Sequence, residues 1–420
     1  LLGEPAYTLD INGMVTDGAL TLTMSYNGKQ YKSSTMKQLA GYIEESLRQL
    51  LQHCVTQERT VLTPSDVLAK GLSIADLEEL SKQTSHIGDI ENVYSLTPMQ
   101  KGMLFHDMFE PHTGAYFEQA AFDFKGSFDP TAFGHSLDAV VERHAILRTN
   151  FYSGWGSEPL QVVFRHRGAK LVSEDLREMN APQREAYLKT FAAEDKAQGF
   201  NLAEDELLRV SILQTDEESF RLLWSFHHIV MDGWCVPLIT QEVFEHYFAL
   251  LEGREPQLAE VQPYSRYIEW LEQQDEAAAA DYWSRYLAGY EQQTLLPQVG
   301  GAVKGEGYVA EKLNYPVSRE LTERLEKVAR DAHVTMNILL QSIWGVALQR
   351  YNGSRDVVYG SVVSGRPAEI PGIDRMIGLF INTIPVRVKT EEHLPFTVLM
   401  KQQQEQYMAF DMYDSYPLCE

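Results

Sequence analysis

The sequence is poor in cysteine and has no long apolar run. Its three cysteines, Cys54, Cys235 and Cys419, are scattered and odd in number, so they predict neither a disulfide framework nor a zinc motif. No apolar stretch approaches the roughly 18 residues that a membrane-spanning helix needs. The first residues, LLGEPAYTLDI, resemble no signal peptide and include no initiator methionine. We therefore expect a cytoplasmic protein and a fragment of a longer chain.

Positive charge is also scarce. The 59 acidic residues outnumber the 36 basic residues, which gives a net charge of −23, and no run holds five or more Lys and Arg. Such a chain should repel nucleic acid and anionic membrane surfaces. The 44% hydrophobic and 23% charged content is ordinary for a globular protein, and 420 residues are enough for two or three domains.

The first part of the chain predicts a strand, a turn, a second strand and a helix. Residues 20–26 alternate as a strand, Asn27-Gly28 predicts a turn, and apolar residues between Leu39 and Leu51 recur at helical spacing. Residues 1–55 are too few for a convincing core of their own and resemble the tail of a domain that begins upstream. Residues 56–92 are more polar and are predicted to form a linker, with a short helix that Ser73 caps.

From Val93 onward, strands and helices interleave. This pattern predicts an α/β or α+β protein with two lobes, and Gly300-Gly301 is the expected internal boundary. Strands are expected at 117–124, 160–164, 208–213, 220–227, 357–363 and 379–388, and helices at 130–144, 237–251, 277–290, 319–332 and 336–351.

Two adjacent histidines follow the predicted strand at 220–227, in the sequence SFHHIVMDGW. Neighbouring side chains of a strand point to opposite faces. His228 shares the parity of the apolar residues Phe220 to Phe226, and His227 points the other way. This argues against one metal bound by both rings, and no third ligand stands at a familiar spacing.

Either ring, taken alone, is as well explained by a structural histidine in the core. His228 differs because it lies at the corner after the strand, close to Asp232 and Gly233. An imidazole is the usual general base near neutral pH, and a glycine lets the backbone approach a ligand and offer an N–H to an oxyanion. Asp232 could bind the ring or pair with an arginine, and the spacing alone leaves both alternatives open.

The motif HHIVMDGW (227–234) resembles the HHxxxDG signature of condensation domains from nonribosomal peptide synthetases, which are part of the chloramphenicol acetyltransferase-like superfamily. Further motifs resemble those of the same family and stand in the family's order, so that the resemblance covers 93–420. They are LTPMQKGMLFH (96–106), RHAILRTNF (143–151), PYSRYIEWL (263–271), IGLFINTIPVR (377–387) and YDSYPL (413–418).

The resemblance implies roles for particular residues. His228 would be the catalytic residue and His227 a structural one. Asp232 would hold the loop by a salt bridge, for which Arg366 is the candidate partner. Gly233 would bring backbone close to the reacting thioester, and Asn382 would lie near the substrates, whereas its residue type alone favours a turn or a sheet edge. Two arginines in the second motif, at 143 and 148, are expected to be structural.

The resemblance also implies a fold and a reaction. Two lobes, 93–275 and 276–420, would form a V with the active site in a tunnel between them. The amine of an acceptor aminoacyl thioester would attack the carbonyl of a donor thioester and form a peptide bond. The 4′-phosphopantetheine of carrier domains would deliver both substrates, with no directly bound cofactor or metal. Carrier, adenylation and epimerization domains would be the partners, with no nucleic acid or membrane involved.

The ends of the chain carry two further expectations. Residues 1–55, together with LTPSDV (62–67), resemble the end of an epimerization domain and its exit linker, which implies a D-configured donor. The chain ends before family members do, so the second lobe is expected to be truncated.

Three other functions compete with this one. An epimerization domain carries the same histidine motif but usually continues as DGVSWR, whereas DGWCVP (232–237) stands here. A free-standing acyltransferase fits less well with a tail and linker from a preceding module. An inactive fragment that only docks carrier domains is disfavoured because His228, Asp232 and Gly233 are all present.

Overall fold

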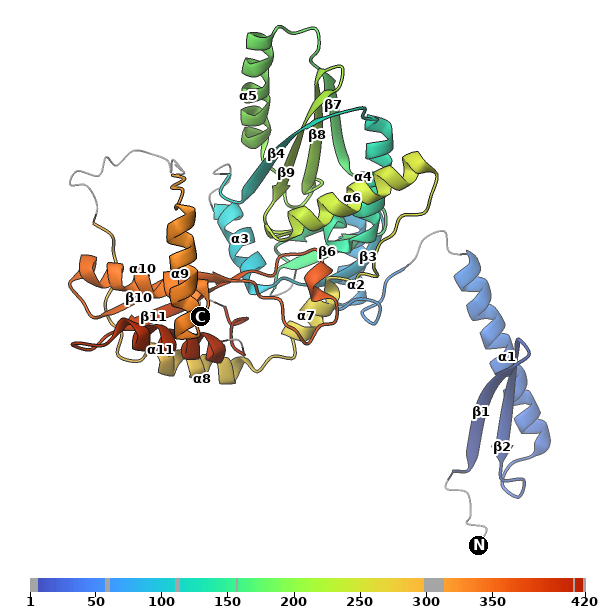
Figure 1. Ribbon diagram of the computed structural model, residues 1–420. Helices are drawn as coiled ribbons and strands as arrows, with labels where there is room; N and C mark the ends of the chain where they lie inside the picture. The colour runs from blue at the N-terminus through green and yellow to red at the C-terminus, as the bar shows by residue number, and fades with distance from the viewer. Residues whose placement is uncertain are drawn as a thin grey trace. The chain divides into compact units, whose positions relative to one another are not determined.

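The computed structural model describes residues 7–56, 61–109, 114–155, 158–297, 313–410 and 412–417. The chain divides into two compact units, Leu1–Val61 and Leu62–Glu420 (Figure 1). The expected internal boundary at Gly300-Gly301 lies outside the described residues. No helix within the described ranges is long and apolar enough to cross a membrane.

The first unit is a β-hairpin followed by one helix. Strands β1 (Leu9–Thr16) and β2 (Ala19–Tyr26) pair antiparallel, and helix α1 spans Ser33–Thr56. The hairpin closes at Asp17-Gly18, where φ is 52° and 76°, as a two-residue turn with two positive φ angles requires. The turn expected at Asn27-Gly28 leads instead from β2 towards α1.

The first unit leaves most of its apolar side chains exposed. Met36 is the buried residue of α1, whereas Leu50 and Leu51 are exposed. Between hairpin and helix lies a groove of about 330 Å³, whose lining includes Leu22 and Ile43. A unit of this size has too little interior to enclose its apolar surface.

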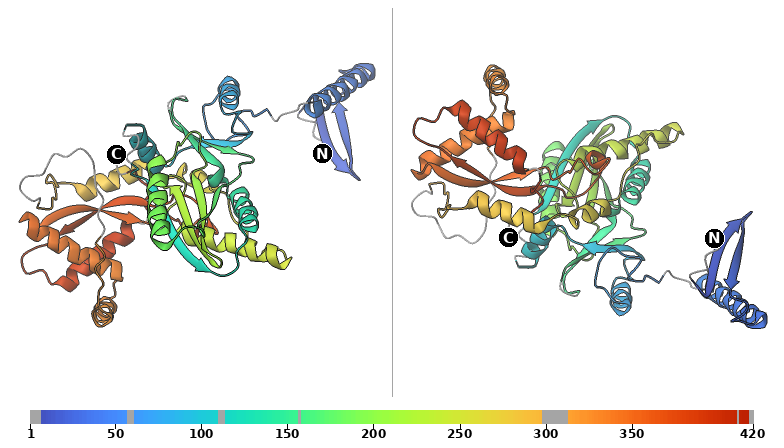
Figure 2. Two further views of the ribbon diagram at one scale, coloured as in Figure 1. Left: turned by 90° about the horizontal axis from the view of Figure 1, so that it is seen from above. Right: turned by 90° about the horizontal axis from the view of Figure 1, so that it is seen from below.

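The second unit contains a four-stranded sheet ordered β4-β9-β8-β7, in which β7 and β8 run parallel and the other pairs antiparallel. Helix α5 covers one face, and α4 and α6 cover the other (Figures 1 and 2). Apolar side chains of β8, β9, α4 and α6 form the largest core. The bounds are β4 (Phe117–Lys125), α4 (Pro130–Arg143), β7 (Lys170–Asp175), α5 (Ala181–Gln198), β8 (Leu208–Asp216), β9 (Ser219–His227) and α6 (Cys235–Glu252).

A second sheet, β3-β6-β5, packs against most of the expected linker, residues 62–92. Leu62, Leu77 and Leu80 are buried in one core with residues of β3 and β6. Residues 62–92 therefore pack as part of the second unit, because their apolar side chains find a sheet to cover. The bounds are α2 (Ile74–Gln83), β3 (Ile90–Ser95), α3 (Pro98–Phe109), η1 (Ala145–Arg148), β5 (Thr149–Tyr152), β6 (Leu160–Phe164) and α7 (Ser265–Leu271).

The last part of the chain builds a separate core on the antiparallel pair β10-β11. Helix α10 approaches β11 closely at Gly345, where an added Cβ would lie 2.5 Å from Val388. Trp283 of α8 and Phe410 of α11 stack over the same core. The bounds are α8 (Glu276–Leu287), α9 (Arg319–Ala332), α10 (Met336–Asn352), β10 (Asp356–Val363), η2 (Ile373–Arg375), β11 (Asn382–Lys389) and α11 (Phe396–Phe410).

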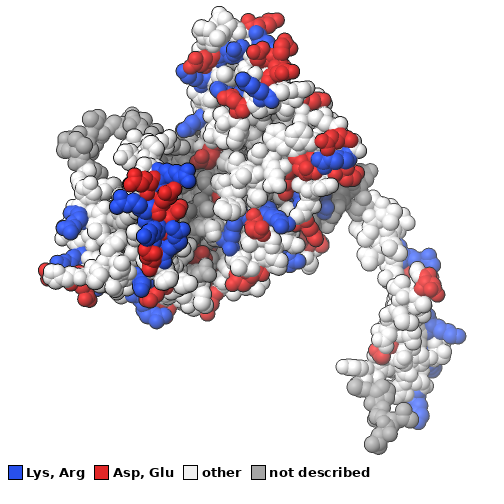
Figure 3. All heavy atoms as spheres, viewed as in Figure 1, with Lys and Arg blue, Asp and Glu red and all other residues white. Residues whose placement is uncertain are grey.

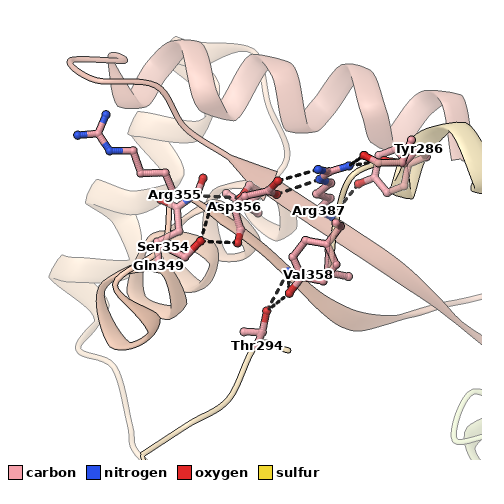
Figure 4. A network of polar contacts seen from close by, with 11 residues as sticks. Tyr286, Thr294, Gln349, Ser354, Arg355, Asp356, Val358 and Arg387 are labelled. Atoms are coloured by element: carbon pink, nitrogen blue, oxygen red, sulfur yellow. Dashed lines mark hydrogen bonds and ion pairs between the residues drawn. The ribbon is translucent and has the colours of Figure 1, made fainter. Parts of the chain in front are cut away.

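A polar network fastens α8 and the residues after it to this pair of strands (Figure 4). Arg387 pairs with both carboxylate oxygens of Asp356, at 2.9 and 2.6 Å, and donates to the carbonyl of Tyr286 at 2.9 Å. The Thr294 hydroxyl accepts from the backbone N–H of Val358 at 3.0 Å. The mixed α/β prediction is thus confirmed. Two sheets lie before α8, and the pair β10-β11 lies after it with a core of its own.

The segment 364–381 connects β10 to β11, but it does not pack on the core of that strand pair. It packs into the core of β8, β9, α4 and α6, which is called the first core below. Its apolar side chains, from Ile370 to Phe380, are buried together with residues of β9 and α6. The strand expected from 379 therefore begins at Asn382, because Leu379 and Phe380 are already buried in the other core.

Acidic and basic side chains are interspersed on the face shown in Figure 3, including the surfaces of α5 and α9. No broad basic patch is visible on that face, in keeping with the net charge of −23.

Candidate active site

His228 is the first residue after β9. The strand is held on both sides, by β4 and β8, and its register with β4 ends at the pair Phe117↔His227. The backbone N–H of His228 still donates to the Tyr116 carbonyl at 2.9 Å. The sheet therefore fixes the backbone that carries His228 before the chain turns into the loop.

His227 is a buried, neutral side chain. Its Nδ1 accepts a hydrogen bond from the backbone N–H of Ile229 at 3.1 Å. Burial, with a smaller contribution from His228, lowers the pKa of His227 to about 3. A ring that stays uncharged and bonds its own loop has the properties of a structural residue.

His228 is only partly buried. Its Nδ1 is buried and has no hydrogen-bond partner among the described residues. Because Nδ1 is enclosed, the part of His228 that remains exposed lies away from this atom. The loop beyond it is anchored, because Ile229, Val230 and Met231 are fully buried.

Asp232 binds backbone and an arginine, and no hydrogen bond in the described structure joins it to either histidine ring. Its Oδ1 accepts from the Trp234 N–H at 3.0 Å and lies 3.5 Å from Nη2 of Arg366. Its Oδ2 accepts from the Phe380 N–H at 3.3 Å, and its own N–H donates to Gly378 O at 3.2 Å. Of the two alternatives that the sequence left open, the structure shows the arginine contact.

Arg366 organises the segment that packs against the loop. Its Nη1 donates to the carbonyls of Ile373, at 2.5 Å, and Met376, at 2.9 Å, and its guanidinium lies 4.1 Å from the ring centroid of Phe380. The 3.5 Å contact with Asp232 is long for a charge-assisted hydrogen bond, so these carbonyls are the closer partners.

Sequence reasoning missed two neighbours of Asp232. The Cys235 thiol lies 3.4 Å from Asp232 Oδ1 and 3.3 Å from Gly378 O, and burial raises the pKa of this thiol to about 12. An added Cβ at Gly378 would lie 2.3 Å from the ring of Tyr264. The i+3 spacing from Asp232 to Cys235 was a signal in the sequence, and Gly378 lies in the motif IGLFINTIPVR (377–387), but neither showed that these residues contact Asp232.

Gly233 and Trp234 leave an accessible surface beside the loop. Gly233 is exposed, and an added Cβ would meet no atom within 4 Å. The side chain of Trp234 is 63% exposed. The glycine is thus not required by packing, and the space beside it is where a substrate could approach the backbone.

Asn382 is bound to the chain itself. Its Nδ2 donates to the carbonyls of Asp414, at 2.6 Å, and Tyr416, at 3.0 Å, and its Oδ1 accepts from the Thr383 N–H at 2.9 Å. It therefore joins the first residue of β11 to the segment 412–417. This is the sheet-edge role that the residue type alone favours, and a role beside the substrates stays a prediction.

A cavity of about 990 Å³ lies next to that segment. Its lining comes from α3, α7, the start of α8 and the segment 412–417, and includes Phe105, Ile268, Tyr413 and Tyr416. Neither histidine of the motif contributes to this lining. The cavity is therefore distinct from the surface around His228.

The two motif arginines have structural partners. Arg148 is buried and donates to Glu91 at 2.6 Å and to the Arg165 carbonyl at 3.0 Å. Arg143 Nε lies 3.2 Å from a carboxylate oxygen of Glu242. Nowhere in the described ranges do three or more His, Cys, Asp or Glu side chains cluster as metal ligands would.

Comparison with protein families gives a match over almost the whole chain. The model of the condensation-domain family matches residues 3–72 and 90–420. One of the mycosubtilin synthase proteins of Bacillus subtilis is 52% identical over 414 residues, or 99% of this chain. Bacitracin synthase 1 of Bacillus licheniformis is 37% identical over 412 residues, or 98% of this chain. The chain spans only 16% and 8% of the lengths of these two synthases.

Solved structures share the fold. The first condensation domain of the calcium-dependent antibiotic synthetase, in complex with a substrate analogue, gives a TM-score of 0.61 at 19% identity and covers 77% of this chain and 76% of that one. A mutant starter condensation domain of rhizomide synthetase, in complex with C8-CoA and Leu-SNAC, gives 0.65 at 19% identity and covers 81% and 75%. The described chain thus has the mixed α/β fold of those domains.

Proposed function

The chain belongs to the condensation-domain family, and from this premise we propose that it catalyses peptide-bond formation between two thioesters. The amine of an acceptor aminoacyl thioester attacks the carbonyl carbon of a donor thioester. A C–N bond forms, the C–S bond breaks, and the leaving thiolate takes up the proton that the amine loses. The observation that carries this proposal is that His228 is only partly buried, whereas the four residues that follow it, 229–232, are buried.

His228 is the proposed catalytic residue. Its accessible edge can take the proton from the attacking nitrogen or stabilise the charged intermediate. General-base help of this kind contributes roughly 10²–10⁴ in rate. Gly233 is proposed to bring its backbone N–H close to the reacting carbonyl, where a donor stabilises developing negative charge.

The other motif residues are proposed to support the site. His227, neutral and bonded to Ile229, shapes the loop. Asp232 and Arg366 join the loop to the segment 364–381. Asn382 fixes the segment 412–417 and is proposed to act near the substrates through it. The two thioesters are proposed to meet in a tunnel between the lobes 93–275 and 276–420, where proximity supplies much of the acceleration.

Carrier domains are the proposed partners, with both substrates held on 4′-phosphopantetheine. Adenylation and epimerization domains are proposed as neighbours in the same synthetase. The relatives named as synthases of mycosubtilin and bacitracin support a multidomain setting, because this chain spans only 16% and 8% of their lengths. No cofactor is proposed to bind the domain directly. A cytoplasmic location is part of the same proposal.

Residues 1–55 are proposed to be the tail of an epimerization-type domain. Two features support this: the family model matches 3–72 separately from 90–420, and the first unit is compact by itself. If the preceding domain makes a D-residue, the donor accepted here has the D configuration.

The test uses the chain with donor and acceptor carrier proteins loaded with aminoacyl groups. The donor carries a D- or an L-residue in parallel, and intact mass spectrometry reports what stands on the acceptor carrier. Transfer from the D-donor alone, lost in His228→Ala, is the expected result. Absence of transfer from either donor contradicts the proposal, and scrambled donor stereochemistry would indicate an epimerase instead.

A further inference from the structure

Gln100, near the start of α3, contacts the backbone of the loop that carries His228. Its side chain is fully buried, and Nε2 donates to the Ile229 carbonyl at 3.1 Å. Ile229 directly follows His228, yet it lies 129 residues away from Gln100 in the sequence. The carbonyl is thus held by a side chain from a different element.

The orientation of the Gln100 amide is fixed by its other partners. Its Oε1 accepts from the Thr97 N–H at 2.9 Å, and the Gln100 N–H donates to Thr97 Oγ1 at 3.2 Å. This reciprocal pair is a capping box at the N-terminus of α3. Because Oε1 is engaged there, the NH₂ group faces Ile229.

A second amide supports the first. Gln161 of β6 is also fully buried, and its Nε2 donates to Gln100 Oε1 at 3.1 Å and to Ser95 O at 2.8 Å. Gln100 is therefore held by the helix on one side and by the β3-β6 sheet on the other. A side chain restrained in this way can transmit the position of the sheet to the loop.

Side-chain hydrogen bonds attach the loop near both of its ends. Asp232 binds the far end to the segment 364–381, whereas Gln100 binds the end beside His228. Ile229 is fully buried, so its carbonyl has no water to replace a lost donor. Without Gln100 the backbone next to His228 would have to move to find another partner.

We propose that Gln100 is a positioning residue that sets the place of the His228 ring. It acts through the Ile229 carbonyl and touches neither substrate nor reacting atoms. The inference rests on the proposed function, which makes His228 the catalytic residue. A displacement of the reacting groups by about 1 Å can cost about 10²-fold in rate, so a small movement of this loop is sufficient for a large effect.

The variant Gln100→Glu separates the two roles of this side chain. It keeps an oxygen for the Thr97 N–H and replaces the NH₂ group with an oxygen that faces the Ile229 carbonyl. The matched control is Gln183→Glu, because Gln183 holds the same position in the capping box of α5, with Asn180 as its partner, and is exposed. Gln100→Met, of similar length and without charge, is a second variant in case Gln100→Glu does not fold.

In the carrier-loaded assay we expect Gln100→Glu and Gln100→Met to lower kcat at least about tenfold, with KM for both carriers unchanged. Gln183→Glu should leave kcat and KM as in the wild type. Each kcat is divided by the folded fraction from thermal unfolding, which removes a loss caused by instability alone. An unchanged kcat, or a loss that this correction removes, overturns the inference.

A second measurement does not depend on catalysis, so it tests the role of Gln100 separately from the proposed function. The ring signal of His228 in a ¹H–¹³C spectrum is assigned by its absence from His228→Ala. It should shift in the Gln100 variants and stay in place in Gln183→Glu. If the wild type transfers nothing, the proposed function fails while this signal still decides whether Gln100 positions the ring; an unshifted signal overturns the inference.

Discussion

The first unit and the core around β9 are both rich in apolar side chains, but only the core buries them. In the loop after β9, the side chains of Ile229 and Met231 are fully buried, whereas Leu51 and Val55 of α1 are 64% and 80% exposed. Both regions follow the apolar spacing of their elements. The difference lies in what surrounds them, because a hairpin with one helix has no second layer to pack on it.

This difference can be measured because all six tryptophans lie after Val61. Tryptophan fluorescence therefore reports unfolding of the second unit alone, whereas far-ultraviolet circular dichroism also reports the first. A substitution in the second unit can thus be compared with a similar substitution in the first unit, and the cost in unfolding free energy can be followed for each.

The largest expected contrast concerns ion pairs. Arg209 and Asp195 pair at 2.5 Å with side chains 6% and 7% exposed, whereas Arg48 and Glu44 pair at 2.8 Å with side chains 70% and 67% exposed. Arg209→Met leaves a buried carboxylate unpaired and should cost about 3–5 kcal/mol of unfolding free energy. Arg48→Met should leave the unfolding free energy close to that of the wild type, because solvent screens an exposed pair. Urea unfolding followed by both signals checks this, and equal costs would contradict it.

Next in size is the truncation of one apolar side chain. Met231→Ala empties a fully buried position in the loop and should cost about 2–5 kcal/mol. The same truncation at an exposed position of α1, Leu50→Ala, should stay within about 0.5 kcal/mol. A large loss for Leu50→Ala would mean that another surface covers α1 in solution, which hydrogen exchange of the α1 amides would then show as protection.

Two glycines with positive φ sharpen the comparison further. An alanine at Gly18, with φ 76° and no atom within 4 Å of the added Cβ, should cost roughly 1–2 kcal/mol from backbone strain alone. At Gly365, with φ 59°, the added Cβ would also lie 1.8 Å from the Phe380 carbonyl oxygen. Gly365→Ala should therefore cost a further 1–3 kcal/mol or so and reduce peptide transfer, because Phe380 binds Asp232. Similar losses for the two variants would show that the segment 364–381 adjusts freely.

The last prediction concerns how the free energy of unfolding depends on pH through His227. Burial lowers its pKa from 6.5 to about 3, so the unfolded state binds the proton first as the pH falls. Stability should therefore decrease as the pH falls from about 6.5 toward 3, by at most about 1.4 kcal/mol per pH unit for this one proton. His227→Asn keeps an acceptor near Nδ1 and removes the titration. The wild type should lose stability relative to this variant between pH 6.5 and 4, in the tryptophan transition; parallel profiles would contradict the assignment.

Several elements were predicted at their observed places because their signals are local. Asp129 caps α4 and Ser73 caps α2, as their sequence positions predict. The strand expected at 117–124 appears as β4, and the one at 220–227 as β9. Hydrogen bonds between residues two or three positions apart decide caps, and alternation decides strand faces, so a single sequence is sufficient for both.

The expected linker shows where local signals fail. Residues 62–92 are polar enough to resemble a tether, but Leu77 and Leu80 pack under the β3-β6 pair. Their burial depends on strand β6, which lies far along the chain. The same limit explains the strand expected from 379, because only the first core shows that Leu379 and Phe380 are already buried.

For the candidate site, the sequence determined the parity of the two histidines: a strand places His227 and His228 on opposite faces whatever its neighbours are. The tertiary structure decided the rest. In the folded chain, Asp232 contacts Arg366 and the backbone of 378–380. Asn382 donates hydrogen bonds to the segment 412–417, and Gln100 donates one to the Ile229 carbonyl. The residues joined through Asn382 lie 32 and 34 positions apart in the chain, and those joined through Asp232 and Gln100 lie 134 and 129 positions apart. Spacing along a sequence does not determine distance in space. Only the packing of the sheets of the second unit with the segment 364–381 could therefore bring those partners together.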